Sequence, residues 1–426
     1  VSGNVTGGSL TGNATGSGAG VTVSGENTTL TNTTVSGTTA DGTGVKVTGS
    51  LTSEGSTTVN GNATGNGTAL VLDNATINAS GYAYNGGNFS IDATVTGDGT
   101  AISTTGENTL TSVALNGTGT GNGSAVVING TLSTDKEIIA TSQGANGTGL
   151  ELSGGTLTGT ASDGSPVNIT VNASDTGTVV HVSDGDSELS NVNLNAGMNN
   201  GTTLDVSGNL TSNVDITVST GNGTALNFSG GSIQGAPDAT VTVNASATRD
   251  TGSAVKVEDG NTGALNSVIL NASATAGDAV SVGGTLNTEY ADINTQVSGN
   301  GTALHVNGGT IQSAGNTTVN ATAAIGQSVV VNNGTLNGDR EGDLIVSATT
   351  ETSDPAVNIS GNSEVTYSQI SGQNNGSGSA VVISGSLTSD GGGEIIGQTV
   401  NGSAVEVMGD TTTVSGITLT GNATGS

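Results

Sequence analysis

Hydrophobic and polar positions along this chain follow a repeat of about 25 residues. Most repeats contain two aliphatic residues two positions apart, with one variable residue between them, as in Val45-Lys46-Val47. A spacing of two is the period of a β-strand with one buried face. The first aliphatic residues of the sixteen repeats are Val21, Val45, Leu70, Ile102, Val126, Leu150, Val180, Leu204, Leu226, Val255, Val280, Leu304, Val329, Val357, Val381 and Val405.

The residues around this pattern assign the inside and the outside of each strand. The second aliphatic position is apolar in every repeat except one, where Thr104 occupies it. The residue between the two aliphatic positions varies widely and includes Lys46, Glu151 and His181, which are costly to bury without partners. We therefore expect the aliphatic pair to face a core and the intervening residue to face solvent.

Two further short strands follow in most repeats, each bounded by Gly, Asn, Asp or Ser. Segments such as 309–311 fit the second strand, and segments such as 317–320 fit the third. Three strands and three turns in about 25 residues make one coil of a solenoid, which buries its inward face only by stacking on its neighbours. The sequence therefore predicts an all-β, elongated, right-handed parallel β-helix of about sixteen three-strand coils, with residues 1–426 as a single domain.

Composition agrees with a thin core and narrows the chemistry. The chain has 73 Gly, no Trp and 1% aromatic residues, too few large side chains for a thick globular core. It also has no Cys, which excludes disulfides, thiolate metal sites and thiol nucleophiles.

The formal net charge of −29 bears on the partners. The five basic residues are dispersed, so nucleic acid and anionic membrane surfaces are unsuitable partners. No apolar run approaches 18 residues, and we expect no membrane insertion of this segment.

Four repeats are longer than the others, at 70–102, 150–180, 226–255 and 329–357. Extra residues in a solenoid leave it as loops on one side, which is often the binding side. The longest of these repeats contains Tyr82, Tyr84 and Asn85, whose rings and amide could bind a sugar or a peptide. The plainer interpretation is that the tyrosines cover a strand edge or the base of a loop.

A second candidate ligand-binding group is Asp184, Asp186 and Glu188, which follow His181 closely. Carboxylates so near one another could hold Ca²⁺, but their spacing is not that of an EF-hand. The plainer interpretation is a solvated acidic turn. We expect no metal and no cofactor.

The sequence shows no combination of residues that is typical of an enzyme active site. His181 and His305 take the same outward position five repeats apart and cannot share a site. The sequence has neither a Gly-x-Ser-x-Gly elbow nor a His-Glu-x-x-His motif. We expect no catalytic residues, although polysaccharide-degrading enzymes also use β-helices.

The runs at 223–233 and 301–311 resemble the passenger domains of AIDA-type autotransporter adhesins of Gram-negative bacteria. The resemblance lies in the repeat style, the lack of Cys, the acidity and the richness in Gly, Asn, Thr and Ser. It implies a passenger fragment that a separate C-terminal barrel exports and anchors in the outer membrane, at the bacterial cell surface or released from it. It also implies attachment to host extracellular matrix proteins or glycans, self-association between cells and biofilm formation.

Two adhesive mechanisms and one passive role fit this resemblance. Loops and outward polar columns could bind a host ligand, or two rods could associate through Asn, Thr and Asp columns. Strong like charge opposes self-association at low salt and favours the first mechanism. A structural stalk without a ligand is the third interpretation. Triplets such as Asn244-Ala245-Ser246 follow from the composition and indicate no function by themselves.

Overall fold

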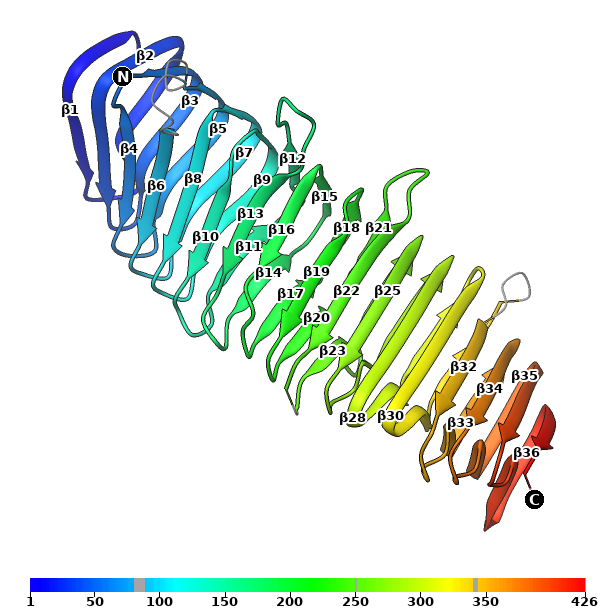
Figure 1. Ribbon diagram of the computed structural model, residues 1–426. Helices are drawn as coiled ribbons and strands as arrows, with labels where there is room; N and C mark the ends of the chain where they lie inside the picture. Colours follow the sequence, from blue (N-terminus) through cyan, green and yellow to red (C-terminus); the bar gives the residue numbers. More distant parts are fainter. Residues whose placement is uncertain (80–88, 250, 340–343, 426) are drawn as a thin grey trace. The chain divides into compact units, whose positions relative to one another are not determined.

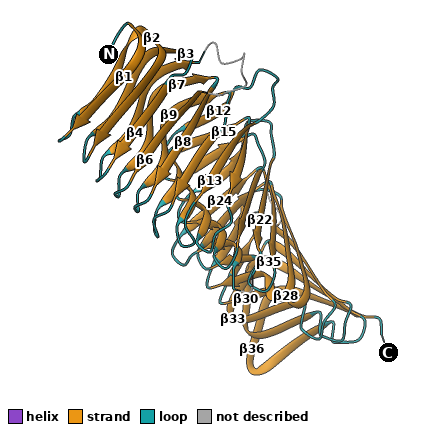
Figure 2. Ribbon diagram, turned by 60° about the vertical axis from the view of Figure 1, so that its left-hand side comes forward, coloured by secondary structure: helices purple, strands orange, loops and turns teal. Residues whose placement is uncertain are grey.

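The computed structural model describes residues 1–79, 89–249, 251–339 and 344–425. These residues form 36 strands, and the colouring of Figure 2 shows strands and loops without a helix. Accordingly, the described part of the chain offers no helix of the length and apolarity needed to cross a lipid bilayer. The protein is a parallel β-solenoid of about sixteen turns, which confirms the predicted fold class.

The chain divides into two compact units, which are described separately. The first is Val1–Leu204 with Gly208–Val214, and the second is Asp205–Ser207 with Asp215–Ser426. That residues 1–426 form one continuous domain stays a prediction.

The strands up to the boundary are β1 (Asn4–Ala14), β2 (Ala19–Thr39), β3 (Thr43–Glu54), β4 (Thr58–Ala63), β5 (Thr68–Asn78), β6 (Phe89–Val95), β7 (Thr100–Thr111), β8 (Val113–Gly119), β9 (Ser124–Thr134), β10 (Ile138–Ser142), β11 (Thr148–Leu152), β12 (Thr156–Gly159), β13 (Val167–Asn172), β14 (Thr178–Val182), β15 (Asp186–Ser190), β16 (Val192–Ala196), β17 (Thr202–Val206) and β18 (Asn209–Ser212). The strands of the second unit are β19 (Ile216–Thr220), β20 (Thr224–Phe228), β21 (Ser232–Gly235), β22 (Val241–Ala247), β23 (Ser253–Val257), β24 (Thr262–Asn266), β25 (Val268–Ala274), β26 (Val280–Val282), β27 (Thr285–Glu289), β28 (Ala291–Asn307), β29 (Thr310–Ser313), β30 (Thr317–Asn332), β31 (Thr335–Asn337), β32 (Leu344–Thr350), β33 (Val357–Thr366), β34 (Ser368–Asn374), β35 (Val381–Thr399) and β36 (Val405–Ala423).

Strands of successive coils stack side by side in each unit (Figure 1), and they do so in the register that the repeat predicts. In the first unit Ile102 pairs with Leu70 of the preceding coil and with Val126 of the next. In the second unit Val357 pairs in the same way with Val329 and Val381. Each pairing joins equivalent repeat positions, so identical positions form columns along the unit.

The predicted inside and outside are confirmed for most repeats. Val45 and Val47 are fully buried, whereas Lys46 between them is half exposed. Thr104 is also fully buried, at the position where other repeats have an aliphatic side chain. Val407 differs from the prediction, because it is 51% exposed. Its strand, β36, pairs along one edge with β35 in the described residues, and that leaves Val407 less covered.

The chain's two phenylalanines, Phe89 and Phe228, are both buried. Phe228 is fully buried in β20, and Gly263 in β24 lies against its ring. A Cβ atom on Gly263 would lie 2.6 Å from Cγ of Phe228. Gly263 therefore provides the space that the ring occupies.

The corner between the second and third strands of a coil takes two forms. Long repeats place a loop there, as at residues 160–166 between β12 and β13 and at 236–240 between β21 and β22. In several short repeats a single residue with left-handed backbone makes the turn, and we call this the tight corner. Residues at tight corners are Asn32, Ser112, Asn191, Ser267, Tyr290 and Tyr367, with φ from 48° to 59°.

Candidate functional site

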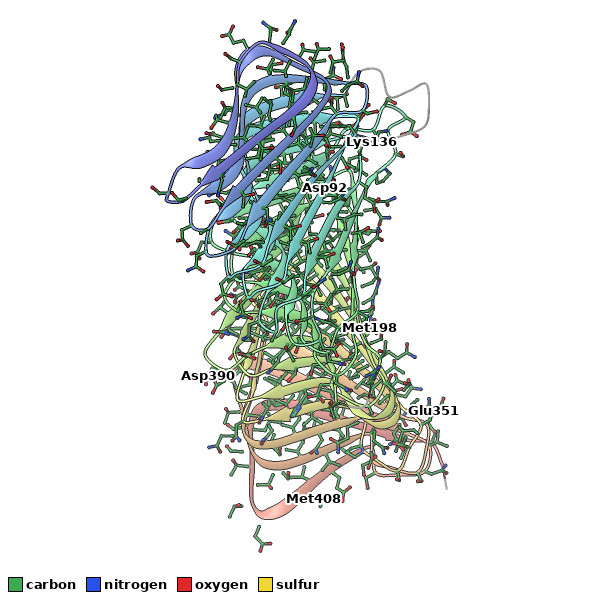
Figure 3. The ribbon with its side chains drawn as sticks, turned by 90° about the vertical axis from the view of Figure 1, so that its left-hand side faces the viewer. Asp92, Lys136, Met198, Glu351, Asp390 and Met408 are labelled. Carbon is green, nitrogen blue, oxygen red and sulfur yellow. The ribbon has the colours of Figure 1, made fainter. Side chains whose placement is uncertain are left out.

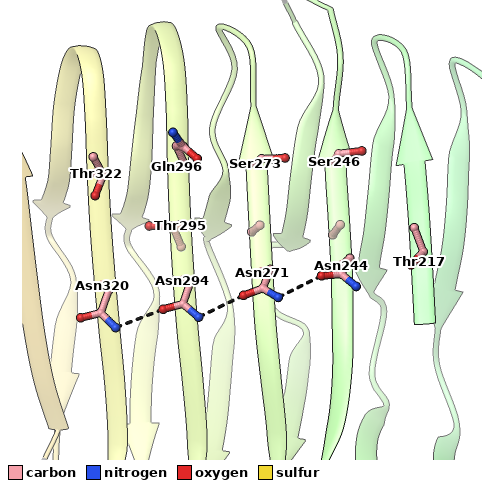
Figure 4. Close-up of a pocket in the computed structure, with 12 residues that line it drawn as sticks. Thr217, Asn244, Ser246, Asn271, Ser273, Asn294, Thr295, Gln296, Asn320 and Thr322 are labelled. Carbon is pink, nitrogen blue, oxygen red and sulfur yellow. Dashed lines mark hydrogen bonds between the residues drawn. The ribbon is translucent and has the colours of Figure 1, made fainter. Parts of the chain in front are cut away.

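The third strands of the second unit carry a column of stacked asparagines on their outward face. Asn244 of β22, Asn271 of β25, Asn294 of β28 and Asn320 of β30 are in register. Each Nδ2 donates to Oδ1 of the preceding coil, at 2.9 Å from Asn271, 3.0 Å from Asn294 and 3.1 Å from Asn320 (Figure 4). We call these four residues the asparagine ladder.

Short hydroxyl and amide side chains flank the ladder and leave a groove of about 490 Å³ beside it. In Figure 4 Ser246, Ser273, Gln296 and Thr322 form the parallel outward column next to the asparagines. The groove is lined by Thr217, Asn244, Ala245, Ser246, Asn271, Ala272, Ser273, Asn294, Thr295, Gln296, Asn320 and Thr322.

The lining of this groove carries no titratable side chain, in a protein with a formal charge of −29. Each of the two inner ladder amides, Asn271 and Asn294, uses one N–H and one acceptor position along the ladder and keeps a second N–H and a second lone pair. A ligand in the groove therefore meets alternating donors and acceptors at the strand spacing of about 4.8 Å. This chemistry suits a neutral polar ligand with several hydroxyl or amide groups.

The first unit has shorter versions of the same arrangement. Asn116 of β8 donates through Nδ2 to Oδ1 of Asp92 in β6 at 2.7 Å, and Asn193 of β16 donates to Asn168 of β13 at 3.0 Å. Figure 3 shows Asp92 on the outer side of its strand, among the side chains that project from the coils. Each of these bonds joins only two coils, whereas the ladder joins four.

The structure describes only one of the two groups of ligand-binding residues that the sequence analysis singled out. Tyr82, Tyr84 and Asn85 lie outside the described residues. Asp184, Asp186 and Glu188 are all exposed, in the turn before β15 and along that strand.

Of the three carboxylates, Asp186 contacts the next coil. Asp186 accepts a hydrogen bond of 2.9 Å from Nδ2 of Asn209, its register partner in β18. Over the described ranges, no group of three or more His, Asp or Glu side chains is arranged to hold a metal ion. A ligand-binding role of Asp184, Asp186 and Glu188 stays a prediction.

His305 in β28 belongs to a second groove of the second unit, together with Lys256, Glu258 and Asp278. Nδ1 of His305 lies 2.9 Å from Oδ2 of Asp278, and Nζ of Lys256 lies 2.9 Å from Oε1 of Glu258. The hydrogen bond with Asp278 raises the pKa of His305, against the opposing effect of burial. Each cation here has its own carboxylate partner.

Ser281 is the register neighbour of His305 and completes a set of Ser, His and Asp residues in this groove. Among the described residues, however, no hydrogen bond joins Oγ of Ser281 to the imidazole ring. A nucleophile in a catalytic triad needs that contact with its base. The geometry therefore assigns no reaction to the set.

No family model matches the chain, and no curated protein matches it.

Outward columns of Asn were expected from the sequence, but the four residues of the asparagine ladder were not identified there, although a signal for them exists. Successive ladder residues are 27, 23 and 26 positions apart, so a search for one fixed interval does not align them. Alignment on the preceding buried residues, Val243, Leu270, Ile293 and Val319, would have placed all four in one column.

Proposed function

We propose that this protein is the binding portion of an extracellular adhesin, which attaches to neutral polar groups of host glycans or matrix proteins. The observation that carries the proposal is the uncharged groove along the asparagine ladder. Its regular donors and acceptors support many weak contacts that add along the second unit. The resemblance to autotransporter passengers supports display at a bacterial cell surface and a contribution to biofilm formation.

The test is saturable binding of the purified chain to an array of immobilised glycans and matrix proteins at two salt concentrations. Because the groove has no charged lining, we expect affinity to change little with salt. If the chain bound no glycan or matrix protein of the array at either salt concentration, the result would contradict the proposal and favour a passive stalk.

A pair of matched variants locates the binding surface. Ser273→Arg places a long side chain in the groove, whereas Thr94→Arg adds the same charge to an exposed outward position of β6 that does not line it. We expect the first variant to lose most binding and the second to bind as the unmodified chain does. Equal binding by both variants would indicate that the ligand binds elsewhere than at the asparagine ladder.

Self-association is the second candidate, because two copies of the ladder have the same period along the strand stack. Sedimentation of the purified chain at low and high salt tests it. Dimers that form at high salt and disappear in Ser273→Arg would support it, since salt screens the like charge of the two copies.

A further inference from the structure

A further groove of the second unit, separate from the ladder groove and the His305 groove, has the composition of a carbohydrate subsite. It measures about 430 Å³ and is lined by Ile345, Tyr367, Ser368, Gln369, Gly392, Gly393 and Glu394. We call it the Tyr367 cleft. It combines one aromatic ring, one exposed aliphatic side chain, one amide and one carboxylate.

The cleft lies on the same outward face as the asparagine ladder. Ile345, Gln369 and Glu394 stack in register on successive third strands, β32, β34 and β35. Ile345 in turn pairs with Thr318, which is two residues before Asn320 of the ladder. Two strand spacings, about 10 Å, separate the strand of Asn320 from that of Gln369.

The tyrosine ring is held in place from both the backbone and the neighbouring coil. Tyr367 occupies a tight corner with φ of 48°, a conformation that bulky residues rarely adopt. Its amide donates to the carbonyl of Gly392 at 2.8 Å. Gly391 lies against the ring so closely that a Cβ atom there would be 2.1 Å from Cζ. The ring therefore has little freedom to lose when a ligand binds.

Polar groups converge on the other side of the cleft. Nε2 of Gln369 donates to Oε2 of Glu394 at 2.7 Å, which fixes both side chains. The carboxylate keeps further lone pairs that can accept from hydroxyl groups. Ile345, with 37% of its surface exposed, adds an apolar wall.

We propose that the Tyr367 cleft binds one pyranose unit of a neutral saccharide. The C–H face of the sugar ring packs on Tyr367 and Ile345, and adjacent hydroxyl groups donate to Glu394 and Gln369. An aromatic surface with a few well-placed polar groups is the usual chemistry of small-ligand recognition. The inference rests on the proposed function in one respect, since it names saccharide as the ligand class on the face that carries the ladder.

The test is ligand-observed NMR of the full chain with the methyl glycosides of glucose, galactose, mannose and N-acetylglucosamine. Tyr367→Asn removes the ring but keeps a residue that the chain itself uses at tight corners, at Asn32 and Asn191. Tyr290→Asn is the matched control, since Tyr290 is 62% exposed at an equivalent corner and does not line the cleft.

We expect saturable binding of at least one glycoside, at least tenfold weaker in Tyr367→Asn and within twofold of the unmodified chain in Tyr290→Asn. Gly391→Ala should also weaken binding, because the new methyl group displaces the ring without removing it. Circular dichroism of each variant shows whether the strands are retained.

Two results would overturn the inference: no saturable binding of any of the four glycosides, or equal affinity in Tyr367→Asn and the unmodified chain. The outcome is separate from that of the proposed function. If array binding is lost in Ser273→Arg but unchanged in Tyr367→Asn, the adhesin proposal stands and the cleft fails.

Discussion

Left-handed backbone at the tight corners is supplied by Asn, Ser and Tyr. Asn suits this conformation because its short side chain bonds locally. Asn32 illustrates this, since its Oδ1 accepts from the amide of Ser56 in the next coil at 3.0 Å. Tyr290 and Tyr367 have no such advantage. Strained residues persist where the surrounding structure holds them, and they occur often at binding sites.

Thr104 is the residue whose replacement should stabilise the first unit. It is fully buried between Leu72 and Ile128, and its Oγ1 has no hydrogen-bond partner. Thr104→Val keeps the shape and removes the unsatisfied hydroxyl, so the free energy of unfolding in urea should rise by about 1 kcal/mol. Thr111→Val, at an exposed position of the same strand, should change it by less than about 0.5 kcal/mol. A lower stability of Thr104→Val than of the unmodified chain would contradict the conclusion that the Thr104 hydroxyl is unsatisfied and destabilising.

The contact between His305 and Asp278 should make stability depend on pH. Because the pKa of His305 is raised in the folded protein, its contribution is fully present below the ordinary value of 6.5. The contribution is lost as pH rises through the higher folded pKa. The denaturation midpoint of the unmodified chain should therefore exceed that of His305→Gln more at pH 5.5 than at pH 8.5.

Asp278→Asn supplies the control for this prediction. In the Asp278→Asn background, His305→Gln should have nearly the same effect at both pH values. A pH dependence that survives the loss of Asp278 would show that another group raises the pKa of His305.

At the scale of the strand, the sequence predicts which residues face inward better than it predicts which residues line up on the outward face. The inward positions followed from the spacing of Val, Ile and Leu, because burial in a parallel stack demands apolar residues at every second position. Outward polar columns were expected, but the residues that form each column did not follow from the sequence, since solvent tolerates most residues there. The ladder depends on register between third strands, and the unequal repeat lengths conceal that register in the sequence.

Leu270 and Ile269 in β25 allow the contributions of an inward and an outward side chain to the free energy of unfolding to be compared. Leu270 is fully buried and Ile269 is half exposed. Leu270→Ala should cost about 2–5 kcal/mol, and Ile269→Ala about 1 kcal/mol or less. In a solenoid the loss stays local, so hydrogen exchange should speed up in β22, β25 and β28 and remain slow in β34 and β35. Uniform acceleration across the second unit would indicate that it unfolds as one block.

For the whole molecule, the amino-acid composition directly gives a strongly negative net charge. Ion pairs of the described residues include Lys46 with Asp73, Lys256 with Glu258 and His305 with Asp278. The hydrogen bond from Lys46 is the main cause of a lowered pKa of Asp73. Five Lys and Arg residues cannot offset the mutual repulsion of 34 Asp and Glu residues.

Salt should stabilise this protein. The Debye length falls from about 30 Å at 0.01 M to about 10 Å at 0.1 M, so repulsion among distant carboxylates weakens. The urea midpoint should rise when NaCl increases from 0.01 M to 0.2 M, and KCl should have the same effect. A midpoint that falls with salt would mean that the few ion pairs outweigh the general repulsion.

The bonds of the asparagine ladder all run in one direction. Turning over one inner amide would bring two oxygens together on one side and two N–H groups together on the other, so the four amides can reverse only as a set. Their dipoles add head to tail in either setting. A saccharide chain, whose two ends differ, therefore meets a surface with a polarity of its own and should settle on it in one preferred orientation.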